Sequence, residues 1–179
     1  MTTKEIFTLS NFMSFVRVLL SVPIFYFISV HDNLYALAVI ILAMITDWLD
    51  GFFARKWKQV TTLGKVIDPL ADKMCTAAGF ISLSLYHGLP FWITFVIVGR
   101  DIIIMLASLI MIGQRKLVMV SNMPGKMTVF FITLLGIVYL IQVEWLKTPL
   151  VIISAVFIVI SIVNYAIGFF KNFSGAHEH

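Results

Sequence analysis

Long apolar stretches alternate with short polar or turn-forming stretches along the whole chain. Each of the six apolar stretches is about long enough to cross a hydrocarbon core of about 30 Å as a helix. They span residues 12–30, 34–53, 64–86, 90–112, 124–143 and 148–170. The pattern predicts an all-α integral membrane protein of six transmembrane helices, forming a single domain over residues 1–179.

The composition supports a membrane location. Hydrophobic residues make up 60% of the chain and charged residues 12%, against about 45–50% and 25% in soluble domains. The excess of Lys and Arg, which gives a net charge of +4, is concentrated in the second and fourth loops. By the positive-inside rule these loops and both termini lie in the cytoplasm, in a multi-pass protein of the cytoplasmic membrane. Anionic lipid is then the natural partner of these cations, and nucleic acid is not needed to explain them.

Four aspartates interrupt the second and third apolar stretches: Asp47, Asp50, Asp68 and Asp72. Each costs roughly 2.5–3.5 kcal/mol at the centre of a membrane helix, so we expect them to line a polar cavity or bind a cation. Their i,i+3 and i,i+4 spacings place each pair on one helix face. In the predicted topology both pairs lie at one depth near the cytoplasmic surface. Two facing carboxylate pairs indicate a divalent-metal site. Interhelical hydrogen bonding and a cation transporter are the alternatives that the carboxylates alone leave open.

The residues around these aspartates form a longer motif. From Asp47 to Asp72 the sequence reads D-x2-D-G-x2-A-R-x8-G-x3-D-x3-D. It resembles the signature of the CDP-alcohol phosphatidyltransferases, and an amino-terminal Asn11-x2-Ser14-x2-Arg17 strengthens the resemblance. The resemblance implies a homodimeric six-helix enzyme that moves a phosphatidyl group from a CDP-linked lipid, CDP-diacylglycerol, to an alcohol and releases CMP.

The same resemblance implies roles for individual residues. Two divalent ions, Mg²⁺ or Mn²⁺, would be held by all four aspartates, and Asp72 would also accept the proton of the acceptor hydroxyl. The residues implied for CDP-lipid binding are Gly51, Ala54, Arg55, Thr61 and Gly64. The role of Arg17 is open, because it can extend to the membrane surface or take part in the site.

The acceptor site is expected at three cations, Arg100, Arg115 and Lys126. Their arrangement resembles phosphatidylglycerophosphate synthases, whose acceptor is glycerol 3-phosphate. Those enzymes typically carry a further Arg where this chain has Ser108. That departure is similar to cardiolipin synthases of the CDP-alcohol type, which use phosphatidylglycerol, and inositol phosphate and serine also remain open. Arg100 and Asp101 form either part of the acceptor site or a mutually neutralising buried pair.

Overall fold

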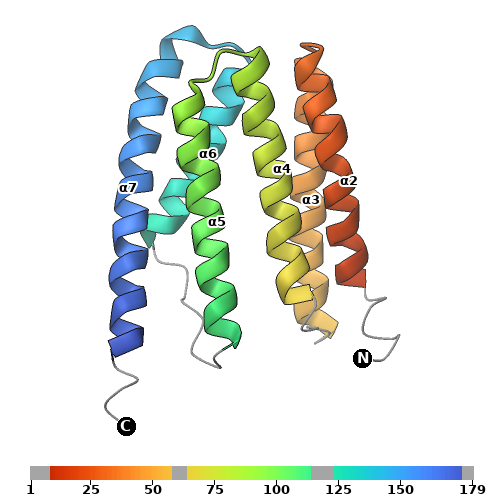
Figure 1. Ribbon diagram of the computed structural model, residues 1–179. Coiled ribbons are helices and arrows are strands. Elements are labelled where there is room, and N and C mark those ends of the chain that lie inside the picture. The colour runs from red at the N-terminus through yellow and green to blue at the C-terminus, as the bar shows by residue number, and fades with distance from the viewer. Residues whose placement is uncertain (1–8, 58–63, 114–122, 175–179) are drawn as a thin grey trace. The chain divides into compact units, whose positions relative to one another are not determined.

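The computed structural model describes residues 9–57, 64–113 and 123–174, with side chains over 12–49, 70–107 and 123–168. Within these ranges the chain forms six helices and no strand, and Figure 1 labels the helices. They are α2 (Leu9–Ser29), α3 (Asn33–Trp57), α4 (Gly64–Tyr86), α5 (Phe91–Gly113), α6 (Met123–Leu140) and α7 (Glu144–Ser174). The prediction of an all-helical chain with six helices is confirmed for this part of the chain.

Two of the helices, α3 and α7, extend into polar residues that the sequence pattern had assigned to loops. The bounds of α4 are as predicted, but α3 continues to Trp57 and α7 begins at Glu144 rather than at residue 148. Glu144 lies in the first turn of α7, where a negative charge is stabilised by the helix dipole. The carboxylate of Glu144 also accepts a hydrogen bond from Lys147 Nζ at 2.6 Å, an i,i+3 pair that stabilises this turn.

Three of the described helices are long and apolar enough to cross a membrane. The spans are Phe12–Ser29, Met123–Leu140 and Glu144–Gly168, and Asn33–Leu49 is a shorter apolar stretch. Helices α3, α4 and α5 each extend beyond the residues whose side chains are described. Large apolar side chains such as Phe95, Phe130 and Val159 are exposed on the helix surfaces, as expected of helices that face lipid. The chain is therefore a membrane protein.

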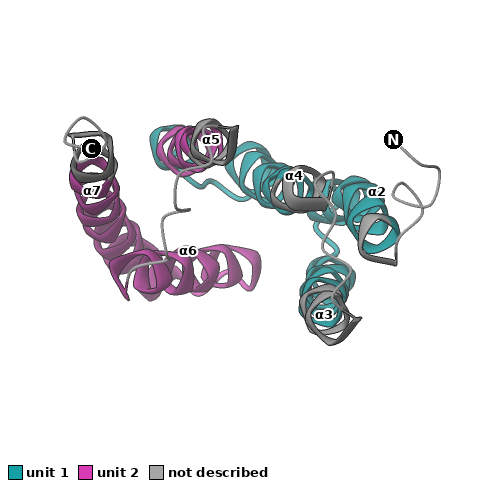
Figure 2. Cartoon of the chain, turned by 90° about the horizontal axis from the view of Figure 1, so that it is seen from below, with its two compact units in different colours: residues 1–94 teal, residues 95–179 magenta. Residues whose placement is uncertain are grey.

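The first of two compact units covers residues 1–94 and contains α2, α3 and α4 (Figure 2). Helix α2 packs against both α3 and α4, so it is the common partner of the two aspartate-bearing helices. Ile24, Ile28, Ala36 and Phe80 are among its buried side chains. Helix α3 ends and α4 begins at the same end of this unit (Figure 1), which places the two aspartate-bearing segments at that end.

At the opposite end of this unit, two histidines connect the helices. His31 occupies the left-handed region, with a φ of 60°, where the chain turns from α2 into α3. Its ring stacks on His87 with centroids 4.8 Å apart. Each Nε2 lies 3.2 Å from a backbone carbonyl oxygen, that of Tyr86 for His31 and that of Ile28 for His87. These contacts join the end of α4 to the turn between α2 and α3.

The second unit covers residues 95–179, where α6 packs against α7. Polar side chains link the two helices: Thr128 Oγ1 donates to the Phe157 carbonyl at 2.9 Å, and Ser154 Oγ donates to the Phe131 carbonyl at 3.3 Å. Small hydroxyl residues of this kind commonly join membrane helices, since no water is present to satisfy them. The prediction that both units form one functional domain stays a prediction.

Candidate active site

The predicted metal ligands lie on two helices of the first unit. Asp47 and Asp50 are in the last turns of α3, and Asp68 and Asp72 are in the first turns of α4. The side chains of Asp47 and Asp72 are described, and those of Asp50 and Asp68 lie outside the described side chains. Both segments lie at one end of the unit (Figure 1), and each of their helices packs against α2.

Asp47 is held by an arginine from the first helix. Arg17 Nη1 lies 2.6 Å from Asp47 Oδ1, and the two side chains differ greatly in exposure, at 2% for Arg17 and 58% for Asp47. Arg17 therefore does not extend to the membrane surface. The pair joins α2 to α3 and leaves the carboxylate accessible.

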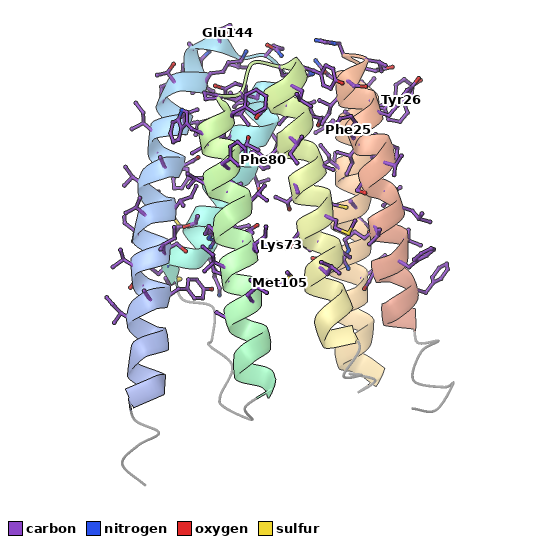
Figure 3. The ribbon with its side chains drawn as sticks, in the orientation of Figure 1. Phe25, Tyr26, Lys73, Phe80, Met105 and Glu144 are labelled. Atoms are coloured by element: carbon purple, nitrogen blue, oxygen red, sulfur yellow. The ribbon has the colours of Figure 1, made fainter. Side chains whose placement is uncertain are left out.

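Asp72 is half-exposed and lies beside Lys73, which Figure 3 labels on α4. Lys73 Nζ is 3.7 Å from Asp72 Oδ2, a distance that gives an ion pair without a short hydrogen bond. The backbone carbonyl of Asp72 accepts a hydrogen bond from Thr76 Oγ1 within the helix. The Asp72 carboxylate is thus on an accessible face of α4, as a group that receives a proton from substrate must be.

The donors suit a hard divalent cation. Mg²⁺ and Mn²⁺ prefer carboxylate oxygens, and the carboxylates of both described aspartates are accessible, with Asp47 58% and Asp72 49% exposed. Where side chains are described, no three His, Cys, Asp or Glu residues gather as a metal site. Two of the four predicted ligands, Asp50 and Asp68, fall outside that set. The accessible carboxylates of Asp47 and Asp72 are suitable ligands for the predicted Mg²⁺ or Mn²⁺ ions.

None of the predicted CDP-lipid contacts is among the described side chains. Gly51, Ala54 and Arg55 lie on the last turns of α3, and Gly64 begins α4. The side chains of these positions are not among the described ones, and Thr61 lies outside the described residues altogether. Their roles stay predictions.

The second unit contains a different arginine–aspartate pair. Arg100 Nη1 lies 2.7 Å from Asp101 Oδ1, and Arg100 Nη2 donates to Ser161 Oγ at 3.0 Å. All three side chains are buried. Arg100 Nε is buried and has no hydrogen-bond partner among the described residues. The geometry is that of a buried pair, and a role for Arg100 toward an acceptor stays a prediction.

Lys126, another predicted acceptor-site cation, is exposed, whereas Arg100 is buried. It lies in the first turns of α6 and is exposed, next to the buried Gly125. A Cβ at Gly125 would lie 3.5 Å from the Tyr165 hydroxyl oxygen, so α7 packs closely on the start of α6. An exposed ammonium at a fixed helix start can bind a phosphate as a point charge. Arg115, the third predicted cation, lies outside the described residues.

Sequence reasoning missed the contacts that organise this site. It left the role of Arg17 open and did not pair it with Asp47. It also did not predict that the Cys75 thiol donates to the Arg17 backbone carbonyl at 2.9 Å. One signal was present in the sequence, because Arg17 interrupts an apolar run and a buried arginine needs a counter-charge.

Comparison with known proteins identifies the family. A family model described as CDP-alcohol phosphatidyltransferase matches residues 7–164. The chain is 35% identical over 170 residues to the CDP-diacylglycerol–glycerol-3-phosphate 3-phosphatidyltransferase of Aquifex aeolicus, covering 90% of this chain and 95% of that protein. It is 41% identical over 86 residues to the Bacillus subtilis protein of the same name, covering 48% of this chain and 44% of that one. A cardiolipin synthase (CMP-forming) of Streptomyces coelicolor is 31% identical over 118 residues, which are 62% of this chain and 53% of that one. The match over most of its length establishes that this chain belongs to the CDP-alcohol phosphatidyltransferase family.

Proposed function

We propose that the protein transfers the phosphatidyl group of CDP-diacylglycerol to glycerol 3-phosphate and releases CMP. The observation that carries this proposal is the match to a glycerol-3-phosphate 3-phosphatidyltransferase over 95% of that relative's length. The aspartate motif on α3 and α4 supports the same reaction.

The carboxylates would hold two divalent ions, Mg²⁺ or Mn²⁺, through Asp47, Asp50, Asp68 and Asp72. When bound, such ions neutralise the charge of a diphosphate and favour its cleavage. Gly51, Ala54, Arg55, Thr61 and Gly64 are the proposed contacts to the CDP-lipid. Arg55 brings a guanidinium fork suited to phosphate oxygens.

In the proposed step the acceptor hydroxyl oxygen attacks the phosphorus that carries the diacylglycerol. The new phosphorus–oxygen bond forms as the bond from that phosphorus to the bridging oxygen of the diphosphate breaks. CMP leaves with the bridging oxygen, and Asp72 accepts the hydroxyl proton. The half-exposed carboxylate of Asp72 supports this assignment, because a base must reach the proton that it removes.

The proposed acceptor site uses Lys126, Arg100 and Arg115 to bind the phosphate of glycerol 3-phosphate. A small dianion needs several cations, and Lys126 is exposed, so its ammonium can contribute one. A second candidate is cardiolipin synthesis from phosphatidylglycerol. Ser108 favours it, as does the 31% identity to the Streptomyces enzyme, but that match covers only 53% of the relative.

We further propose that all six helices span the cytoplasmic membrane, with both termini and the active site facing the cytoplasm and two copies forming a homodimer. The distribution of Lys and Arg supports this orientation. A cysteine introduced at position 147 should react with a membrane-impermeant reagent only from outside the cell, and one at position 116 only from inside. The reverse pattern would contradict the orientation. Mass measurement of the detergent-purified protein by light scattering would test the dimer.

The reaction itself is tested with purified protein, CDP-diacylglycerol and a panel of acceptors, with mass spectrometry of the lipid product. We expect phosphatidylglycerophosphate from glycerol 3-phosphate, loss of CMP release with EDTA, and recovery with Mg²⁺ or Mn²⁺. Cardiolipin formed from phosphatidylglycerol, without use of glycerol 3-phosphate, would replace the main proposal by the second candidate. CMP release that survives EDTA would refute the metal requirement.

A further inference from the structure

Arg17 lies where the three helices of the first unit meet. Its guanidinium binds Asp47 on α3 at 2.6 Å, and its backbone carbonyl accepts the Cys75 thiol of α4 at 2.9 Å. Asp72 precedes Cys75 by three residues, so the two lie on one face of α4. One residue of α2 thus contacts the helix of the first aspartate pair through its side chain and the helix of the second through its backbone.

The ion pair is buried on one side and open on the other. The Arg17 side chain is 2% exposed, whereas that of Asp47 is 58% exposed. A carboxylate has two oxygens and about four lone-pair positions, and Arg17 Nη1 contacts Oδ1. The contact restricts the orientation of the Asp47 side chain while much of the carboxylate stays accessible to another ligand.

We propose that Arg17 is a positioning residue, which fixes the Asp47 carboxylate in the orientation that binds a divalent ion. This inference rests on the metal site of the proposed function. Residues that hydrogen-bond to metal ligands orient those ligands, and their loss typically weakens metal binding by about 10–100-fold. Arg17 fits this role because its own position is fixed by burial and by the contacts of α2 with both neighbouring helices.

The two physical effects of the guanidinium on metal binding have opposite signs. Orientation of Asp47 strengthens binding, whereas the positive charge of Arg17 repels a cation. The proposal states that orientation dominates, so removal of the guanidinium should weaken binding. A role limited to neutralising Asp47 would produce tighter binding on removal, and a role limited to helix packing would leave the affinity unchanged.

The test measures Mn²⁺ binding to the full-length protein in detergent by electron paramagnetic resonance of free Mn²⁺. Arg17→Gln should weaken Mn²⁺ binding by about 10–100-fold, and it should raise the Mg²⁺ concentration needed for half-maximal CMP release by a similar factor. Arg17→Lys retains the charge but not the planar fork, so its affinity should lie between those of Arg17→Gln and the wild type.

Ser84→Ala is the matched control. It removes a buried hydrogen bond of 2.6 Å between Ser84 on α4 and Thr94. Ser84 is about 18 Å from Asp72 along the helix at 1.5 Å per residue. This variant should lose stability without a change in Mn²⁺ affinity.

The outcomes separate this inference from the proposed function. A folded Arg17→Gln or Arg17→Lys that binds Mn²⁺ as tightly as the wild type, or more tightly, would overturn the positioning role. If Arg17→Gln does not fold, Arg17→Lys decides by the same criterion. Absence of Mn²⁺ binding by the wild type, or unchanged binding by Asp47→Asn, would instead refute the proposed metal site.

Discussion

Each of the two compact units (Figure 2) contains an arginine–aspartate pair with a buried arginine, yet the two pairs differ in the exposure of the aspartate. In the first unit Asp47 is 58% exposed, whereas in the second unit Asp101 is 9% exposed. The distances are almost equal, 2.6 Å for Arg17–Asp47 and 2.7 Å for Arg100–Asp101. The two pairs thus have almost the same N–O distance, but only the Asp47 carboxylate is exposed enough to contact a further group.

The difference indicates different roles. Removing two charges from water is costly, and a fully buried pair recovers that cost only through good geometry and further hydrogen bonds. Arg100 makes such a further bond, to Ser161 on α7, which links α5 to α7. The Asp47 carboxylate, by contrast, is largely exposed and can bind a further ligand. We infer that the Arg17–Asp47 pair (the open pair) serves binding, and that the Arg100–Asp101 pair (the closed pair) stabilises the second unit in addition to the acceptor contact proposed for Arg100.

The largest expected effect is on catalysis, at the open pair. Asp47→Asn removes the negative charge that a divalent ion needs, while its side-chain oxygen can still accept the Arg17 hydrogen bond. Loss of several kcal/mol of charge stabilisation should lower the rate of CMP release on the order of a thousandfold or more. Arg17 is buried and loses its counter-charge, so the free energy of unfolding should also fall, but by less than in Asp101→Asn, because Asp47 is 58% exposed and water reaches its side of the pair. Substantial activity in the folded variant would contradict the role given to Asp47.

The next effect is on stability, at the closed pair. Asp101→Asn leaves the buried Arg100 guanidinium without a counter-charge, and we expect a loss of about 3 kcal/mol in the free energy of unfolding. The measurement is chemical unfolding in detergent, followed by circular dichroism.

The double variant Arg100→Met, Asp101→Leu is the control for this stability prediction. It replaces both charges by apolar side chains, and it should be closer in stability to the wild type than Asp101→Asn. Equal losses in the single and double variants would show that the charge pair is not the cause. A loss in Asp47→Asn as large as that in Asp101→Asn would remove the contrast between the two pairs.

A smaller effect is expected at the exposed cation of the second unit. Lys126→Ala removes one charged contact to the acceptor phosphate, worth about 1.5–3 kcal/mol. The KM for glycerol 3-phosphate should therefore rise roughly tenfold or more, with little change in the KM for CDP-diacylglycerol. Lys126→Arg should retain most of the affinity. An equal rise in both KM values would place Lys126 outside the acceptor site.

The smallest effect is expected at the pair that begins α7, whose carboxylate is exposed. Glu144 is 76% exposed and lies 2.6 Å from Lys147, whose side chain is 13% exposed and also donates to Gln142 Oε1 at 2.7 Å. Exposed pairs contribute about 0–1 kcal/mol, so Glu144→Gln should change the unfolding temperature only slightly. A loss as large as that of Asp101→Asn would show that bond length, rather than burial, determines the cost of breaking these pairs.

The sequence alone determined which parts of the chain are helical. The predicted segment 64–86 coincides with α4, because the length of an apolar run and its polar ends are local properties. The family followed from residues close together in the sequence, the motif from Asp47 to Asp72, and the comparisons confirm it. The assignment of Glu144 to a loop was wrong, because a charged residue is as stable in the first turn of a helix as in a loop.

Tertiary structure decided which charged groups are paired and which are accessible. From the sequence alone, the neighbouring residues Arg100 and Asp101 could form either a buried pair or part of an acceptor site. Only the tertiary structure brings Ser161 of α7 to Arg100 of α5. Arg17 and Asp47 are far apart in sequence and meet because α2 packs on α3. The physical reason is that a side chain's exposure depends on the neighbouring helices that cover it. Helix formation depends mainly on a residue's neighbours along the chain, whereas the exposure of Asp47 depends on where α2 and its arginine lie.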